Sequence, residues 1–338
     1  MKNKAILFAT LAAVCFGLSS CNDEWEDELY TQMVSFKAPN GGNDVYDIHI
    51  RYQEDGSGVY QLPVIISGTT DNAADRDIKI GVSPDTVKFL NQEKFPTTRP
   101  DLWFKQLPEQ YYSFPTTVCH IPAGKNTENF QIDFNLKGLD LSEKWLLPMT
   151  VLEDPSYRLN YRKGRCRALL NINLFNDYSG TYSATGMNIY IDGTNTDPAV
   201  VDTRVAKVVD ANTIFFYAGS VWEEDESRAK YKVNVRFDKG EKNERGAIKG
   251  NVTLYAGNPD DPTSIESVPE NCYYVYEVKP HTTQPYIERR LTTLYLDYYY
   301  TDITSDPKAP MRYHVQGTMT MERQYDTRIP DEDQAILW

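Results

Sequence analysis

Short segments of alternating apolar and polar residues, separated by turn residues, follow one another from Met33 to the end of the chain. In Tyr231–Phe237, for example, apolar side chains occupy every second position and polar ones the positions between them. Successive side chains of a strand point to opposite faces, so this period of two indicates strands with one buried face. Such strands bury a core when two sheets pack face to face or when one sheet closes into a barrel. We therefore expect an all-β protein.

Residues 33–175 are expected to form an immunoglobulin-like β-sandwich domain. Alternating segments at Val45–Tyr52 and Val59–Ile66 flank a glycine-rich turn, a pattern that predicts a hairpin. One short helix is expected at Pro84–Lys94, where a serine and a proline open the helical pattern and a later proline ends it. Short strands at this spacing, with turn chemistry between them, indicate an antiparallel sandwich of immunoglobulin-like size.

Residues 176–338 are expected to form a second, β-rich domain. A new alternating series begins after Phe175, and strand-like segments then follow at Met187–Ile191, Arg204–Val209, Thr213–Tyr217, Tyr231–Phe237, Ala247–Tyr255, Tyr273–Val278, Arg290–Tyr300 and Met311–Met321. Such a meander can close into an antiparallel, lipocalin-like β-barrel, which removes exposed strand edges, or fold as a second sandwich. Both alternatives stay open at this point, with the barrel favoured.

The N-terminus has the layout of a bacterial lipoprotein signal. After a short basic start, the apolar run Ala5–Leu18 is too short to span a bilayer as a helix. It ends in Leu18-Ser19-Ser20-Cys21, the pattern that a lipoprotein peptidase cleaves once lipid is attached to the cysteine thiol. We expect residues 1–20 to be a signal peptide, Cys21 to carry the lipid and residues 21–32 to form an acidic tether. The alternatives are a plain secretory signal with a coincidental cysteine, and an uncleaved anchor.

The charge balance argues against nucleic acid as a partner. The chain has 35 basic and 48 acidic residues, and its formal net charge of −13 becomes more negative without the lysines of the signal. Proteins bind a phosphate backbone by neutralising it with Lys and Arg side chains. An acidic chain of this kind is better suited to other ligands.

Three cysteines remain beyond the signal and the lipidation site, namely Cys119, Cys166 and Cys272. An odd number permits at most one disulfide within the chain. Cys119 and Cys166 both lie on strand-like segments of the first half, so either they pair or all three are buried thiols. Their spacing, with no set of histidines nearby, predicts no metal site.

The common catalytic motifs are missing from the sequence. There is no Gly-x-Ser-x-Gly elbow, His-Glu-x-x-His helix, phosphate-binding glycine loop or EF-hand loop. The histidines are scattered over strand-like segments and a loop, at His49, His120, His281 and His314. A glycosidase needs only two carboxylates, so a hydrolase remains a minor alternative. We expect no catalytic residues, no cofactor and no metal. The stretch Asn258–Pro262 has calcium-type oxygen ligands but is better explained as an acidic turn between prolines.

Glycan binding without catalysis needs flat aromatic faces for the apolar side of a sugar ring and polar groups for its hydroxyls. Trp222 lies in a charged loop between two strands and is the first candidate, although it could equally fold over the barrel mouth as a plug. Trp103 is the second, although apolar neighbours favour core packing. Tyr298 and Tyr300 share one face of a strand and complete the set, while Tyr299 points to the other face.

Several stretches resemble a family of Bacteroidota surface lipoproteins. Leu107-Pro108-Glu109-Gln110-Tyr111-Tyr112-Ser113, Ile121-Pro122-Ala123-Gly124-Lys125 and Leu147-Pro148-Met149 resemble its N-terminal immunoglobulin-like domain. The ending, with Ile329-Pro330-Asp331-Glu332-Asp333-Gln334-Ala335-Ile336, looks like the β-rich C-terminal domain that often accompanies it. The acidic residues after Cys21 also resemble a surface-export signal of such lipoproteins. The family is similar in layout to lipoproteins encoded beside the outer-membrane glycan importer pair SusC and SusD.

The resemblance implies a non-catalytic glycan-binding lipoprotein of a SusC/SusD-type polysaccharide uptake system. It would be anchored in the outer membrane by its lipid and would face the cell exterior. The resemblance supplies no ligand-contact motif, so the candidate site rests on the aromatic residues above. The main alternative is a structural or assembly lipoprotein that docks on an importer without binding glycan itself.

Overall fold

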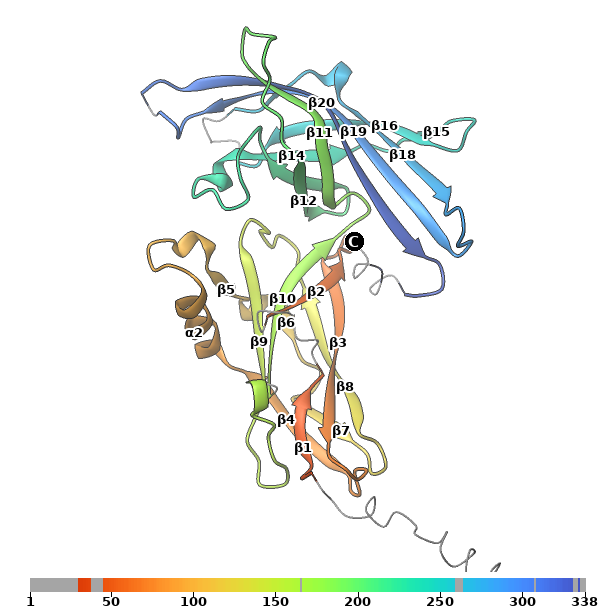
Figure 1. The fold of residues 1–338 in the computed structure, drawn as a ribbon. Coiled ribbons are helices and arrows are strands. Elements are labelled where there is room, and N and C mark those ends of the chain that lie inside the picture. The colour runs from red at the N-terminus through yellow and green to blue at the C-terminus, as the bar shows by residue number, and fades with distance from the viewer. Residues whose placement is uncertain are drawn as a thin grey trace, which may run out of the picture.

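The computed structural model describes residues 30–37, 45–164, 166–258, 264–306, 308–330 and 334. Figure 1 shows two β-rich bodies stacked end to end, with α2 on the flank of the first. The expected all-β fold is confirmed. The signal peptide, Cys21, most of the tether and residues 259–262 of the suggested calcium loop lie outside the described residues.

The first body is a sandwich of two sheets, with strand orders β1-β3-β8-β6 and β2-β10-β9-β4-β7, and β5 beside β9. Apolar side chains between the sheets, such as Leu62, Ile132 and Leu170, form its core. Its strands are β1 (Met33–Phe36), β2 (Val45–Arg51), β3 (Ser57–Ser67), β4 (Arg76–Val82), β5 (Phe104–Gln106), β6 (Tyr112–Ser113), β7 (Val118–Ile121), β8 (Thr127–Asn135), β9 (Lys144–Val151) and β10 (Arg167–Phe175).

The strands predicted as a hairpin form, but they do not pair with each other. β2 belongs to one sheet and β3 to the other, so the turn between them carries the chain across the sandwich. Gly56 in this turn has a φ of +80°, and a Cβ there would collide with Lys137. The expectation of a purely antiparallel sandwich is also wrong, because β2 pairs in parallel with β10 and β5 in parallel with β9.

The predicted helix is confirmed as α2 (Pro84–Lys94). Its side chains Val87 and Leu90 are buried against Leu146 and Leu169 on the outer face of the β9–β10 sheet. The other helical elements among the described residues are short 3-10 turns: η2 (Pro100–Leu102), η3 (Glu109–Tyr111), η4 (Arg162–Gly164), η5 (Arg228–Tyr231) and η6 (Pro269–Asn271).

The second body is a closed antiparallel barrel of eight strands. Each barrel strand pairs with the next along the chain, β14 with β16, and the ring closes where β20 pairs with β11. The barrel alternative is therefore confirmed over the second sandwich. Its strands are β11 (Gly180–Ile191), β12 (Thr203–Asp210), β13 (Thr213–Tyr217), β14 (Lys232–Phe237), β16 (Ile248–Ala256), β18 (Tyr273–Pro280), β19 (Ile287–Asp302) and β20 (Met311–Asp326), with short β15 (Glu241–Lys242) and β17 (Glu266–Ser267) attached to β16 and β19.

Side chains fill the barrel interior, and two of the candidate glycan contacts are among them. Tyr298 and Tyr300 are only 1% and 2% exposed and belong to the barrel core. The Tyr298 hydroxyl accepts a hydrogen bond from the backbone N–H of Gly219 at 3.3 Å. Their assignment as glycan contacts is wrong, because the alternation of β19 turns both rings inward and leaves Tyr299 outside.

Cys119, Cys166 and Cys272 are all buried and free, so the disulfide alternative is wrong and the buried-thiol alternative is confirmed. Burial raises the pKa of the Cys119 thiol to about 11, which makes it a poor nucleophile at neutral pH. Across the described ranges, no helix is long and apolar enough to cross a membrane.

Candidate functional site

The two bodies share one apolar cluster where they meet. Val208, Phe215 and Tyr217 on β12 and β13 are buried in the same cluster as the sandwich core. Lys232 crosses the edge of this junction, with its ammonium 2.7 Å from the Asp140 carboxylate and 5.0 Å from the centroid of the Phe215 ring. Domains joined through a continuous apolar contact move little relative to each other.

A buried ion pair joins the loop before β5 to the loop after β13. The guanidinium of Arg228, whose side chain is 7% exposed, contacts the Asp101 carboxylate at 3.1 Å and donates to the Asp101 carbonyl at 2.6 Å. Arg99 contacts the same carboxylate at 2.9 Å and also donates to the carbonyl of Glu224. Hydrogen bonds from Arg99 and then Arg228 lower the pKa of Asp101 to about 2, against the opposing effect of burial.

The linker between β10 and β11 is held from both sides. The Asn176 amide donates to the backbone carbonyl of Asp210 at 2.9 Å, and Arg323 of the barrel donates to the Asn176 carbonyl at 2.7 Å. Arg51, at the end of β2, contacts the Asp177 carboxylate at 3.0 Å. The relative position of the two bodies is therefore set by contacts from β2, the linker and β20.

A cavity of about 250 Å³ lies between the two bodies, beside these contacts. One wall is the outer face of β2 and β10 with the start of β9, and the other is the outer face of β11 and β12, which stand opposite each other in Figure 1. Amide, hydroxyl and charged groups border a larger apolar area, a lining that suits a small ligand with both polar and apolar faces. The polar side chains are His49, Glu143, Lys144, Asn171, Asn173, Ser179, Thr181, Lys207 and Arg323, and the apolar ones include Leu141, Val205 and Ala206.

Partial burial shifts the pKa values of the charged groups around the cavity. It lowers the pKa of Lys144 and of Lys207, and it raises the pKa of Glu223, whose carboxylate lies 3.8 Å from the Lys207 ammonium. The amides of Asn171 and Asn173 both donate to one oxygen of Asp47, at 2.6 and 3.1 Å, which fixes their orientation. Hydrogen bonds made to such fixed, partly desolvated groups are stronger than those made at an open surface.

Trp222 stands on the loop between β13 and η5 with 79% of the residue exposed. The alternative that it plugs the barrel mouth is therefore wrong. Its loop is held in place, because the carbonyl of Trp222 accepts from the N–H of Asp225 at 3.1 Å and Val221 packs against both apolar cores. The next residue, Glu223, reaches Lys207 on the cavity wall. Trp222 is thus an exposed ring on a fixed loop at the rim of the junction.

Trp103 follows η2 in the loop that carries Asp101, so the contacts of Asp101 with Arg228 bring this loop to the Trp222 loop. The Trp103 side chain is partly buried, as its apolar neighbours suggested. Its indole Nε1 and the Oε1 atom of Glu223 are buried with no hydrogen-bond partner among the described residues. Most buried polar atoms in proteins are paired, and an unpaired one calls for a bound water, ion or ligand.

The outer wall of the barrel carries aromatic pairs that the sequence reasoning missed. Tyr299 stacks on His314 with centroids 4.3 Å apart and also has the guanidinium of Arg312 4.7 Å from its centroid. Tyr273 stacks on Tyr295 at 4.2 Å. Each stacked pair joins residues directly opposite each other on neighbouring strands, which become visible only once the register is known. Because these rings already contact each other, they offer less free surface than Trp222.

The histidines are not gathered into one site. His49 lines the junction cavity, whereas His120 and His314 each lie 2.7 Å from an aspartate elsewhere, Asp77 and Asp297. In the part of the chain that the structure describes, no three His, Cys, Asp or Glu side chains are grouped to hold a metal ion. The groups that the junction does present offer hydrogen bonding, ring stacking and charge.

Two family models match the chain. One is described as a domain of unknown function, DUF4973, and covers residues 25–155, and the other is described as a C-terminal domain and covers residues 166–320. No curated protein is detectably similar.

Solved structures of Bacteroides proteins match over nearly the whole described chain. A Bacteroides ovatus protein of unknown function is 41% identical with a TM-score of 0.79, covering 89% of this chain and 98% of that one. A Bacteroides ovatus multidomain protein including DUF1735 is 40% identical with a TM-score of 0.78 and the same coverage. An auxiliary nutrient binding protein from Bacteroides thetaiotaomicron is 31% identical with a TM-score of 0.74, covering 87% of this chain and 96% of that one.

Proposed function

Since the chain belongs to the family of two-domain Bacteroides proteins that these structures represent, we propose that it is a non-catalytic glycan-binding protein of a nutrient uptake system. A relative called an auxiliary nutrient binding protein, 31% identical over 96% of its own length, supports a binding role. The observation that carries the proposal is the junction, where Lys207 lines a cavity with polar and apolar walls and also contacts Glu223, the residue next to the exposed Trp222.

The proposed mode of binding follows from these groups. The apolar face of a sugar ring stacks on the indole of Trp222. Hydroxyls of the same or the next ring reach Glu223 and Lys207, and Asn171 and Asn173 offer amide groups on the opposite wall of the cavity. A ligand hydroxyl near Glu223 would also satisfy its unpaired Oε1 atom. Stacking combined with a few fixed polar groups gives both affinity and orientation.

We further propose that lipid on Cys21 holds the protein on the outer membrane, facing the cell exterior. An acylated cysteine followed by an acidic tether would let the two bodies reach a glycan and present it to a SusC/SusD-type importer. Replacing Cys21 with Ala should release the protein from the membrane fraction of cells. Retention of the Cys21→Ala protein in that fraction would contradict the lipid anchor.

The binding proposal is tested by affinity electrophoresis of the body from residue 30 onward in gels that contain plant, host or fungal polysaccharides. Selective retention is expected in at least one gel, without shortening of the polysaccharide. Trp222→Ala should weaken binding to that polysaccharide by about 2 kcal/mol, roughly thirtyfold in Kd, as for a central aromatic contact. Lys207→Met should also weaken binding, because the cavity loses one of its two ammonium groups.

The matched control is Phe89→Ala. Phe89 is also an exposed aromatic residue, 65% exposed, but it lies on α2 away from the junction. Its replacement should leave retention unchanged. Equal losses in Trp222→Ala and Phe89→Ala would contradict the assignment of the site. No retention across a broad panel would contradict glycan binding and favour the assembly role, and release of reducing ends would indicate a hydrolase.

A further inference from the structure

The junction cavity has a lysine side chain on each of its two walls. Lys144 lies at the start of β9 and Lys207 lies on β12, and both line the cavity. Burial has the largest effect in lowering the pKa of Lys207, and the charge of Lys144 acts in the same direction. The two ammonium groups are therefore close enough to act on each other. A negative charge placed between the walls would be attracted from both sides.

One carboxylate lines the cavity among the described residues, and it is already paired. This is Glu143, whose Oε1 atom lies 2.8 Å from the ammonium of Lys105, outside the lining. Glu223 approaches Lys207 from the Trp222 loop at 3.8 Å, which is longer than the ~2.7–2.9 Å of a charge-assisted hydrogen bond. The Lys207 ammonium can therefore still donate a short hydrogen bond to an anionic ligand.

Lys144 makes no ion pair with the residues that the structure describes. Its Nζ atom lies 5.3 Å from the centroid of the Phe95 ring and 6.0 Å from that of Phe104, so the nearest compensation is a cation–π attraction. Burial, the largest effect, lowers the pKa of Lys144, and the charge of Glu224 opposes it. The nearby Asp47 accepts hydrogen bonds from two asparagine amides. A partly desolvated ammonium group that faces rings instead of a carboxylate gains stability from an anionic ligand.

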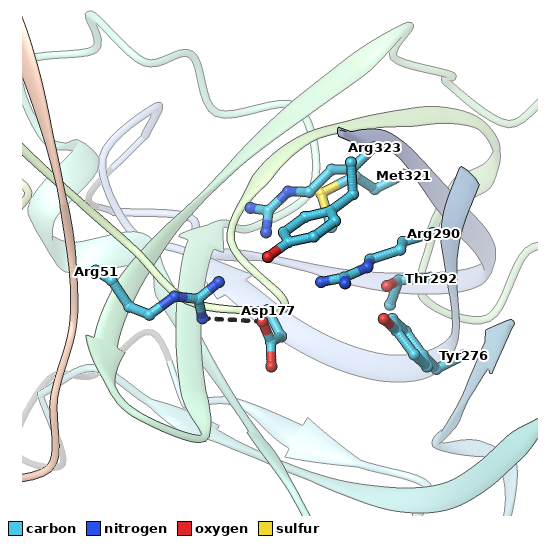
Figure 2. Close-up of a pocket in the computed structure, with 8 residues that line it drawn as sticks. Arg51, Asp177, Tyr276, Arg290, Thr292, Met321 and Arg323 are labelled. Carbon is cyan, nitrogen blue, oxygen red and sulfur yellow. Dashed lines mark hydrogen bonds and ion pairs between the residues drawn. The ribbon is translucent and has the colours of Figure 1, made fainter. Parts of the chain in front are cut away.

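Contacts on the linker fix the two walls relative to each other. Figure 2 shows the guanidinium of Arg51, at the end of β2, directed at the Asp177 carboxylate of the linker, 3.0 Å away. Arg323 on β20 donates to the carbonyl of Asn176, and the Asn176 amide donates to β12. The two ammonium groups are thus held in place before a ligand arrives, which lowers the entropic cost of binding between them.

We propose that the junction cavity binds an acidic sugar whose anionic group lies between Lys144 and Lys207. This inference rests on the proposed glycan-binding function and names the class of glycan. The cavity of about 250 Å³ is smaller than the ~300–1,000 Å³ of sites for drug-sized ligands, so it suits a single sugar ring. Leu141, Val205 and Ala206 offer the apolar surface for that ring. The anionic group is a uronate carboxylate or a sulfate ester.

The charge of the whole chain makes such binding a sharp observation. The formal net charge is −13, so most of the protein surface repels a polyanion. Retention of the protein by an acidic polysaccharide therefore requires a specific site and does not follow from general electrostatic attraction.

The test compares polysaccharides that differ in their charged group. Affinity gels at constant ionic strength contain polygalacturonate or its methyl ester, and dextran sulfate or dextran, with alginate, hyaluronan and chondroitin sulfate extending the acidic panel. We expect retention in a charged gel to be at least about tenfold stronger than in its neutral counterpart. A preference for polygalacturonate over dextran sulfate would identify the carboxylate, and the reverse would identify the sulfate ester. Retention by neutral polysaccharides alone would overturn this inference and leave the proposed binding function standing, whereas no retention in any gel would contradict both.

Substitutions then locate the anionic group. Lys144→Met and Lys207→Met should each weaken retention in the charged gel at least about tenfold, whereas Lys144→Arg keeps the charge and should keep most of the retention. Lys249→Met is the control, because Lys249 also faces an aromatic ring, 4.1 Å from the Tyr273 centroid, but does not line the cavity. Glu143→Gln removes the carboxylate of the lining and should strengthen retention. Equal retention of Lys144→Met and Lys249→Met would overturn the proposal, as would losses in Lys144→Arg as large as those in Lys144→Met.

Discussion

Replacing Asp101 with Asn tests the buried ion pair that joins the two bodies. Asn has the shape of Asp but cannot neutralise Arg228, whose side chain is 7% exposed. The pKa of Asp101 falls from 3.8 to about 2 in the folded protein, which corresponds to at most about 2.4 kcal/mol at ~1.36 kcal/mol per pH unit. Because the Asp101 side chain is still 17% exposed, solvent screening reduces the expected loss to about 1–2 kcal/mol. For the two bodies together, about 300 residues at about 2.1 cal/mol/K each, that lowers the Tm by about 2–3 °C.

The loss of Tm in Asp101→Asn should depend on pH. A carboxyl group whose pKa is lowered on folding stabilises the protein above its unfolded pKa of 3.8, and this stabilisation is lost as the pH falls toward about 2. The difference in Tm between the wild type and Asp101→Asn should therefore be full at pH 5–7 and roughly halved at pH 3.

Circular dichroism melts at pH 7, 5 and 3 measure these differences. The control is Asp202→Asn, because Asp202 is exposed and the replacement removes the same charge. Asp202→Asn should melt like the wild type at each pH. Equal Tm values for the two variants at pH 7, or a difference for Asp101→Asn that does not shrink at pH 3, would refute the reasoning.

Three further predictions concern the barrel and the thiols. Tyr298→Ala should cost about 3–5 kcal/mol in chemical denaturation, whereas Trp222→Ala should cost less than about 0.5 kcal/mol, and equal losses would contradict the inward position of Tyr298. Gly317→Ala should cost more than about 1 kcal/mol, because Gly317 has a φ of +138° and a Cβ there would collide with the carbonyl of Gly186; an unchanged Tm would count against this. Because burial raises the pKa of Cys119 to about 11, thiol reagents should modify it slowly at pH 8 and rapidly in denaturant, and fast native modification would disagree with its buried position.

Alternation along the chain predicted the strands and favoured a closed barrel over a second sandwich, because both depend on local periodicity and on the need to cover strand edges. It did not predict how the first strands pair. A tight turn such as the one at Gly56 can join two strands of one sheet or carry the chain between sheets, and only tertiary packing decides between them. The helix Pro84–Lys94 was predictable because its start and stop signals lie within it and beside it.

The candidate site was less predictable than the fold. Trp222 could be singled out because a tryptophan in a charged loop has no obvious core to join, although its contact with glycan remains a prediction. For Tyr298 and Tyr300 the alternation was right, but the sequence did not say which face of the strand was buried. The cavity residues His49, Asn171 and Lys207 lie far apart along the chain and meet only when the bodies stack, so no local pattern marks them.

The most direct test of the central claim is a crystal structure of the two-domain body with an oligosaccharide that the affinity gels have identified. We expect sugar density in the junction cavity, with one ring stacked on Trp222 and a hydroxyl within hydrogen-bond distance of Glu223 or Lys207. Sugar density elsewhere on the molecule, for example on the stacked rings of the outer barrel wall, with the junction cavity empty, would contradict the account.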